Sequence, residues 1–135
     1  MEQKGMDVST FQGEIDWEKV KAAGIEFAMV RAGFGKDAGQ TDAQFVRNMA
    51  GAAKAGVPVG AYWFSYALSP EAAREEARTA LEVIKPYKLA YPVAYDYEYD
   101  TVRYAEENGV SVTRELATAC CKAFCEELEA AGYLP

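Results

Sequence analysis

The sequence predicts an α/β protein with parallel strands, because apolar segments typical of strands alternate with amphipathic segments typical of helices along all 135 residues. Strands that alternate with helices are joined by right-handed crossovers and therefore run parallel. Two architectures share this order, an open doubly wound sheet and a (β/α) barrel. The length suits one domain, residues 1–135, with about four βα units.

The first strand and helix are short, and the second strand is long. The strand is expected at residues 5–9 ("GMDVS") and the helix at 16–24, where Asp16 can cap the start and Gly24 can end it. Residues 27–34 ("FAMVRAGF") are apolar at positions on both faces, as parallel strands covered by helices tend to be.

The second helix and third strand are bounded by clear signals. Thr41 and Gln44 have capping-box spacing and Gly56 can stop the helix. The third strand is expected at residues 57–66 ("VPVGAYWFSY"), with Pro58 tolerated near its start.

The third helix has the strongest pattern in the chain. It covers residues 69–85, with Ser69 as cap and Pro70 in the first turn. A fourth strand is expected at residues 91–100 ("YPVAYDYEYD"), and a fourth helix is expected to follow Thr113 and to run to Gly132.

Composition excludes several kinds of function. The net charge of −7 argues against nucleic-acid binding, and no apolar run approaches the ~20 residues that span a bilayer. The first ten residues contain no apolar core of a signal peptide. Histidine is absent, which removes Ser-His catalysis and imidazole metal sites, so acid–base chemistry must use carboxylates, tyrosines or lysines.

The three cysteines are expected to be reduced and mostly buried. Cys120, Cys121 and Cys125 share an apolar helical stripe with neighbours such as Phe124 and Leu128. An odd number of cysteines does not form a disulfide framework, and a thiolate metal site would lack a fourth ligand.

The most informative segment is the end of the fourth strand. Asp96, Glu98 and Asp100 occupy alternate positions, so on a strand all three carboxylates point the same way. Carboxylates gathered in this way repel one another and resist burial. In parallel α/β folds the functional groups gather at the carboxyl ends of strands, where Asp7 also lies.

Aromatic residues follow the third strand to the same edge. Tyr62 and Phe64 lie near its end, so three strand ends converge on carboxylates and rings. This combination suits glycosidic bond cleavage, in which one carboxylic acid protonates the leaving oxygen and an anion supports the oxocarbenium-like centre. The spacing fits a retaining or an inverting course. Binding of Mg²⁺ or Ca²⁺ by the same carboxylates is an alternative that nothing else in the chain supports.

Three segments carry a family resemblance, and together they run from residue 4 to the C-terminus. They are "KGMDVSTFQGEIDWEKVKAAGIEFAMVRAGFG", "DAQFVRNMAGAAKAGVPVGAYWFSYA" and "KPYKLAYPVAYDYEYD". The chain resembles the N-acetylmuramidase type of lysozyme, glycoside hydrolase family 25. The resemblance implies a TIM-barrel type of fold and cleavage, without cofactor or metal, of the β-1,4 bond between N-acetylmuramic acid and N-acetylglucosamine in bacterial peptidoglycan.

The resemblance also implies roles for individual residues. Glu98 takes the place of the general acid, Asp96 that of the partner carboxylate, and Asp7 that of a supporting aspartate. The candidates for substrate binding are Tyr62, Phe64, Arg31 and Asp100.

The resemblance covers about four βα units, which implies the N-terminal half to two thirds of a catalytic domain. Three hypotheses follow: a muramidase completed by another chain or copy, a glycan-binding fragment without turnover, and a fragment that is stable through self-association. Open edge strands and an uncovered inner face predict a homodimer. The expected place of action is the bacterial cell wall, outside the cell or after release by lysis.

Overall fold

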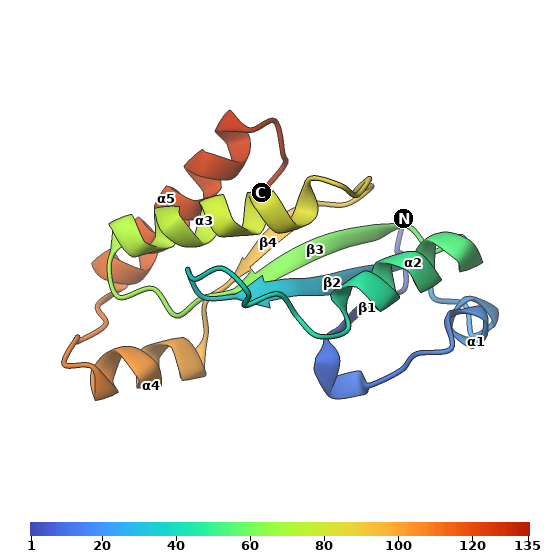
Figure 1. Cartoon of the computed structure of the whole chain (residues 1–135), viewed down its shortest axis with the longest axis horizontal. Helices are drawn as coiled ribbons and strands as arrows, with labels where there is room; N and C mark the ends of the chain where they lie inside the picture. The colour runs from blue at the N-terminus through green and yellow to red at the C-terminus, as the bar shows by residue number, and fades with distance from the viewer.

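The protein is built on one parallel sheet of four strands. The computed structural model describes residues 1–135, and its strands are β1 (Gly5–Val8), β2 (Phe27–Phe34), β3 (Val59–Phe64) and β4 (Val93–Asp96). Their spatial order is the chain order, β1-β2-β3-β4 (Figure 1). A doubly wound sheet would reverse its strand order at a switch point, and this sheet does not. The sheet is also open, with β1 and β4 at its two edges.

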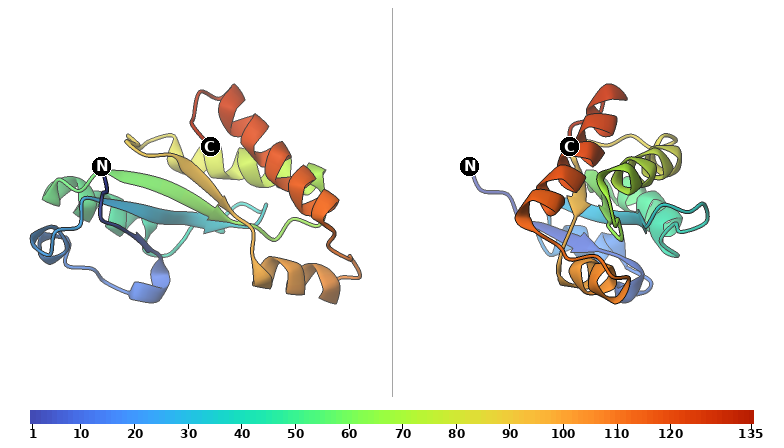
Figure 2. Two further views of the ribbon diagram at one scale, coloured as in Figure 1. Left: turned by 180° about the vertical axis from the view of Figure 1, so that it is seen from behind. Right: turned by 90° about the vertical axis from the view of Figure 1, so that its left-hand side faces the viewer.

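Five α-helices and one 3₁₀ turn join the strands. They are η1 (Thr10–Gln12), α1 (Trp17–Ala22), α2 (Phe45–Ala55), α3 (Pro70–Ile84), α4 (Tyr99–Glu107) and α5 (Arg114–Ala130). Helices α2 and α3 pack on β2, α5 packs on β4 and on α3, and α1 packs on α2. Helix α4 lies apart, at the end of the sheet where β4 finishes (Figures 1 and 2).

The main core lies between one face of the sheet and the helices. Val30, Ala61, Trp63 and Val93 project from neighbouring strands into this core and are buried. The alternating residues on the opposite face, such as Met29, are only half-buried. The expectation that helices cover both faces of residues 27–34 is therefore wrong, because one face of the sheet has no helix on it.

Most predicted helix boundaries are confirmed. The side chains of Asp16, Ser69 and Thr113 cap α1, α3 and α5, and Pro70 is the first residue of α3. Gly56 follows α2 with a φ of 75°, a left-handed conformation that glycine adopts without strain.

The capping box expected from Thr41 and Gln44 is wrong. Helix α2 begins at Phe45, and Gln44 precedes it without a side-chain capping bond. The carboxylate of Asp42 instead accepts a hydrogen bond from the Gln44 amide at 2.9 Å. An aspartate two residues earlier thus satisfies the free amide that a capping box would have served.

The fourth strand is shorter than expected, and helix α4 was not predicted. The strand ladder ends where Asp96 pairs with Phe64, and α4 begins at Tyr99. Asp100 therefore lies in the first turn of a helix, and Glu98 directly precedes that helix. The prediction that Asp96, Glu98 and Asp100 share one face of a strand is wrong, because the chain leaves the sheet after Asp96.

The three cysteines are free thiols, as predicted. Cys120 is fully buried, and Cys121 and Cys125 are half-buried on α5. Burial raises the pKa of all three thiols, that of Cys120 to about 11. Buried neutral thiols of this kind act as small apolar groups in the packing of α5 on its neighbours.

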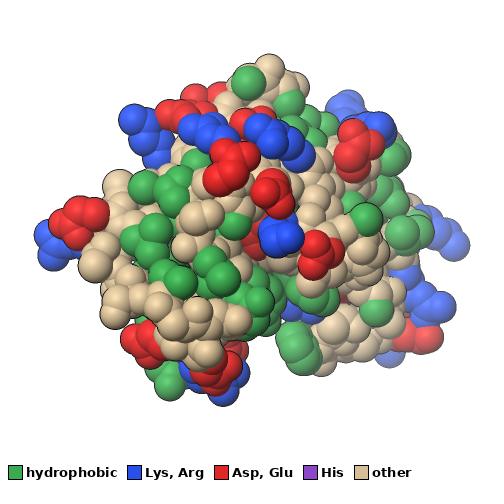
Figure 3. All heavy atoms as spheres, turned by 60° about the vertical axis from the view of Figure 1, so that its left-hand side comes forward, with side chains coloured by type: hydrophobic (Ala, Val, Ile, Leu, Met, Phe, Trp, Pro, Cys, Tyr) green, Lys and Arg blue, Asp and Glu red, His purple; other side chains and the backbone are tan.

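The surface combines charged and apolar groups. In the view of Figure 3, acidic and basic side chains lie next to one another with apolar side chains exposed between them. Several acidic and basic groups form ion pairs, such as Arg74 with Glu126 at 2.7 Å between α3 and α5. None of the helices is both long enough and apolar enough to cross a bilayer.

Candidate active site

A cleft of about 400 Å³ lies at the carboxyl ends of the strands. All seven residues predicted for the site line it: Asp7, Arg31, Tyr62, Phe64, Asp96, Glu98 and Asp100. Four further residues complete the lining: Ser9, Phe11, Gln12 and Tyr66. The structure therefore brings every predicted site residue into one cleft, including Asp100, which reaches it from α4.

The parallel register explains how these residues meet. Arg31 of β2 pairs with Tyr62 of β3, and Phe64 of β3 pairs with Asp96 of β4. Residues paired across parallel strands project to the same face. Asp7, on β1, faces the same cleft from the far edge of the sheet.

The cleft continues along the uncovered face of the sheet. Asp7, Tyr62 and Asp96 also line a second hollow of about 340 Å³, together with Met29 and Ala94. The acidic groups thus lie where a polar cleft meets a more apolar sheet surface.

Asp96 is the carboxyl group with the most perturbed environment in the cleft. Burial raises its pKa above the usual value, and the negative charges of Glu98 and Asp7 raise it further. The positive charge of Arg31 acts in the opposite direction. Such a group holds its proton at a pH where an ordinary aspartate is ionised.

Glu98 is exposed at the mouth of the cleft, directly before α4. Its backbone is extended, and its amide donates a hydrogen bond to Thr101 Oγ1 at 3.2 Å. Asp100, also exposed, pairs with Arg103 at 3.2 Å. Glu98 and Asp100, like the exposed Asp7, are therefore reachable from solvent, whereas Asp96 lies deeper.

Arg31 is held in place by an aspartate that the sequence did not reveal as important. Its Nε donates to Asp42 Oδ2 at 2.7 Å, and the Asp42 side chain has no exposed surface. Asp42 also accepts hydrogen bonds from the amides of Thr10 at 3.0 Å and Gln44 at 2.9 Å. Asp42 thus joins β2, the turn after β1 and the start of α2 around the Arg31 guanidinium.

The aromatic rings divide between the two faces of the sheet, as alternation predicts. Tyr62, Phe64 and Tyr66 line the cleft, whereas Trp63 is fully buried and donates from Nε1 to the Gly35 carbonyl at 2.8 Å. Burial raises the pKa of Tyr62, partly offset by Arg31. Its phenol is therefore neutral and able to donate a hydrogen bond to a ligand.

Phe11 is a lining residue that pattern reasoning missed. It lies in η1, and the residue is 81% exposed. The Arg31 guanidinium lies over its ring, 5.2 Å from the centroid, and over the ring of Phe34 at 5.5 Å. A large exposed ring beside a cationic group was not detectable from strand periodicity, because η1 lies in the loop after β1.

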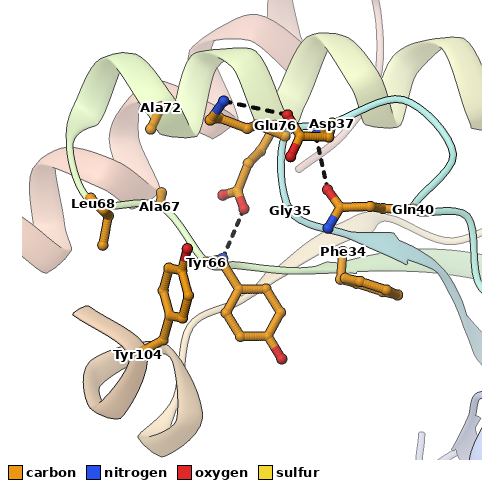
Figure 4. Close-up of a pocket in the computed structure, with 11 residues that line it drawn as sticks. Phe34, Gly35, Asp37, Gln40, Tyr66, Ala67, Leu68, Ala72, Glu76 and Tyr104 are labelled. Carbon is orange, nitrogen blue, oxygen red and sulfur yellow. Dashed lines mark hydrogen bonds and ion pairs between the residues drawn. The ribbon is translucent and has the colours of Figure 1, made fainter. Parts of the chain in front are cut away.

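A neighbouring hollow of about 420 Å³ lies on the other side of Tyr66. Figure 4 shows the rings of Tyr66 and Tyr104 side by side below the strand end, and the side chain of Glu76 descending from α3 toward the backbone of Tyr66. Tyr66 lines both hollows, so it forms the wall between them.

No histidine, cysteine, aspartate or glutamate side chains form a group of three or more that could hold a metal ion. The chemistry that the cleft itself offers is that of clustered carboxyl groups with a guanidinium, a neutral phenol and aromatic faces. These are groups that transfer protons, stabilise positive charge and bind sugar rings.

Comparison with known proteins places this fold in a carbohydrate-cleaving class. The family described as glycosyl hydrolases family 25 matches residues 6–135. The chain belongs to this family. A curated relative, lysozyme M1 of Streptomyces globisporus, is 42% identical over 62 residues, which are 46% of this chain and 20% of that protein.

Solved structures share the fold. The modular autolysin LytC of Streptococcus pneumoniae is 26% identical with a TM-score of 0.80, covering 97% of this chain and 30% of LytC. A family 25 glycosyl hydrolase of Bacillus anthracis is 30% identical with a TM-score of 0.78, covering 96% of this chain and 56% of that protein. This chain thus spans between a fifth and little more than half of these relatives.

Proposed function

We propose that the cleft is the active site of a lysozyme-type glycoside hydrolase. Its substrate is bacterial peptidoglycan, and the bond cleaved is the β-1,4 bond between N-acetylmuramic acid and N-acetylglucosamine. The observation that carries the proposal is the gathering of Asp7, Asp96 and Glu98 in one aromatic-lined cleft. A structure of LytC in complex with a synthetic peptidoglycan ligand supports the substrate class. The place of action is accordingly the bacterial cell wall.

Glu98 serves as the general acid in this proposal. Its exposed position at the mouth of the cleft lets it reach the glycosidic oxygen of a bound chain. Asp96, deeper in the cleft, is the partner carboxylate that supports the positive charge developing at the sugar carbon. The negative charge of Asp7, on the opposite edge strand, raises the pKa of Asp96 further.

The proton distribution of the free protein has to change for these roles. The raised pKa of Asp96 places a proton on Asp96 more readily than on an ordinary aspartate. The reactive form carries one proton on Glu98 and none on Asp96, and Arg31 favours this form because its charge lowers the pKa of Asp96.

The other lining residues bind the substrate. Tyr62 and Phe64 offer ring surface to the sugars, Arg31 offers a cationic group, and Asp100 offers an acceptor at the mouth of the cleft. Phe11, exposed beside Arg31, extends the aromatic surface.

The test is to identify the product. The chain is incubated with purified peptidoglycan, and new reducing ends are labelled and identified by mass spectrometry. The proposal predicts reducing ends on N-acetylmuramic acid that increase with time. Reducing ends on N-acetylglucosamine, or soluble fragments without new reducing ends, would contradict it.

A second candidate is self-association through the uncovered face of the sheet. This face exposes Asp7 and Ala94 and leaves Met29 and Tyr62 half-buried, and both edge strands are open. We propose that a second copy covers this face in a two-fold homodimer with more than ~1,000 Å² buried, the threshold for a specific interface. Such a dimer would narrow or close the cleft. Light scattering at micromolar concentration decides this, since a monomer mass would refute the dimer.

A further inference from the structure

A fully buried carboxyl group lies behind the cleft. Glu76 of α3 has no exposed surface, and burial raises its pKa. Its carboxyl group accepts hydrogen bonds from Ser65 Oγ at 3.0 Å, the Tyr66 amide at 2.8 Å and the Tyr95 hydroxyl at 2.5 Å. Burying an acidic group is costly unless such bonds compensate, so this position combines a cost in stability with a well-defined geometry.

Ser65 connects Glu76 to both segments that carry the candidate catalytic carboxyls. Its amide donates to the Asp96 carbonyl at 2.9 Å. Its carbonyl accepts from Thr101 Oγ1 at 2.8 Å, and Thr101 Oγ1 in turn accepts from the Glu98 amide at 3.2 Å. Ser65 and Thr101 are fully buried, so the bond between Thr101 Oγ1 and the Ser65 carbonyl is shielded from water, whereas the bond from the Glu98 amide to Thr101 is part-buried.

We propose that Glu76, Ser65 and Thr101 form a buried relay that fixes the backbone of Glu98 relative to Asp96. None of the three lines the cleft, so they are positioning residues. The relay is needed because Glu98 lies beyond the last ladder pair of β4, where the sheet no longer holds it. The role of these residues in catalysis rests on the proposed function, whereas their hydrogen-bonded connection to the Glu98 backbone does not.

The value of such a link follows from the chemistry of paired carboxyls. An acid and its partner must lie within a narrow distance range of the reacting bond, and a misplacement of ~1 Å can cost ~10²-fold in rate. An exposed glutamate on an unsupported loop would sample many positions. The relay instead connects the backbone at Glu98 to helix α3 through hydrogen bonds made by the buried residues Thr101, Ser65 and Glu76.

Thr101 offers a matched pair of substitutions. Thr101→Val keeps the shape and removes the hydroxyl, whereas Thr101→Ser keeps the hydroxyl. In T101V the Glu98 amide should exchange with solvent about two- to tenfold faster, the range that one net hydrogen bond supplies. The carbon-13 titration of the Asp96 carboxyl should also move to lower pH, because Glu98 no longer holds its charge nearby. In T101S both quantities should remain near those of the wild type.

The remote end of the relay gives the more demanding test. Ser65→Ala removes the hydroxyl, with its bonds to Glu76, to the Tyr95 hydroxyl and to the Ala67 amide, and leaves the Ser65 backbone bonds in place. Glu98 amide exchange should still accelerate, although no group touching Glu98 is lost. Glu76→Gln should act in the same direction, and the amide of Ala52 in α2 serves as a control for global opening.

The outcomes separate the relay from the proposed function. Glu98 exchange that is faster relative to that of Ala52 in S65A or E76Q supports the relay even if the chain cleaves no peptidoglycan. Where the wild type is active, T101V should lower kcat with little change in KM, and T101S should restore it. Unchanged Glu98 exchange in S65A and E76Q, or an unchanged Asp96 titration in T101V, would overturn the proposal.

Discussion

Replacing Arg31 with methionine should destabilise the protein strongly, because it leaves Asp42 buried without its ionic partner. The Asp42 side chain has no exposed surface, and that of Arg31 is only 12% exposed. Methionine has a similar length and cannot donate a hydrogen bond. The substitution therefore removes the 2.7 Å bond between Arg31 Nε and Asp42 Oδ2 without creating a new one.

The size of the loss in stability depends on the hydrogen bonds that Asp42 retains in R31M. Removing one partner of a buried ion pair costs ~3–5 kcal/mol, and a hydrogen bond to a charged group contributes ~1.5–3 kcal/mol. Asp42 retains the amides of Thr10 and Gln44, which still stabilise its charge. We expect R31M to lower the free energy of unfolding by about 2–4 kcal/mol. For a domain of this size the loss corresponds to a decrease in Tm of roughly 10 °C.

Urea unfolding followed by tryptophan fluorescence measures this loss. Arg47→Met is the matched control, because Arg47 pairs with Glu14 at the surface with both side chains exposed. Exposed pairs contribute ~0–1 kcal/mol, so R47M should unfold close to the wild type. In an Asp42→Asn background R31M should cost much less. A loss for R31M no larger than that for R47M would show that the Arg31–Asp42 pair does not stabilise the fold.

Three further predictions concern titration and reactivity. Asp7→Asn should lower the pKa of Asp96, because it removes a neighbouring negative charge. The acid limb of the activity profile should then move to lower pH, since the reactive Asp96 is ionised above its pKa. A carbon-13 titration of Asp96 that shows no downward shift would contradict this. Cys120 should react with a thiol reagent more slowly than Cys121 and Cys125, because it is buried and its thiol has a pKa of about 11; peptide mapping of the labelled native protein gives the order, and equal rates would refute it. Folding raises the pKa of Glu76, so ionisation of its carboxyl group lowers the stability of the wild type as pH rises. Glu76→Gln should therefore gain stability relative to the wild type between pH 4 and pH 8. Urea unfolding at these two pH values that shows no relative gain would contradict the raised pKa of Glu76.

Hydrophobic periodicity predicted the strands and helices whose caps, propensities and apolar pattern agree with the way they pack in the fold. Residues 27–34 form β2 with the predicted bounds, and the Ser69–Pro70 pair begins α3 as predicted. In both cases the cap, the propensities and the apolar pattern favour the same structure, so packing had nothing to override.

Helix α4 was missed because its first residues imitate a strand. Residues 95–100 alternate aromatic and acidic side chains, which is the pattern of a half-exposed strand. The strand ladder stops at Asp96, and the helix that follows begins with Glu98 bonded to Thr101. An acidic residue at 98 with a hydroxyl residue at 101 was the available signal for a helix start, although their order is the reverse of a common capping box.

The residues that line the cleft were predictable from the sequence, but the buried residues that hold them in place were not. Strand ends indicated Asp7, Tyr62 and Asp96, because the carboxyl ends of parallel strands converge. Asp42 and Glu76 gave no such signal, since one lies in a loop and the other in a helix with many charged residues. Their burial depends on contacts between distant segments, which single-sequence patterns do not contain.

The proposed function requires that the carboxyl groups of the cleft cleave glycan chains. The most direct measurement is the initial rate at which reducing ends form from peptidoglycan with the wild type, with Glu98→Gln and with Glu106→Gln, a control at an exposed position of α4. We predict that E98Q lowers the rate by ~10²–10⁴-fold, as expected for loss of a general acid, whereas E106Q leaves it unchanged. A rate for E98Q close to that of E106Q would contradict the assignment of Glu98 as the general acid.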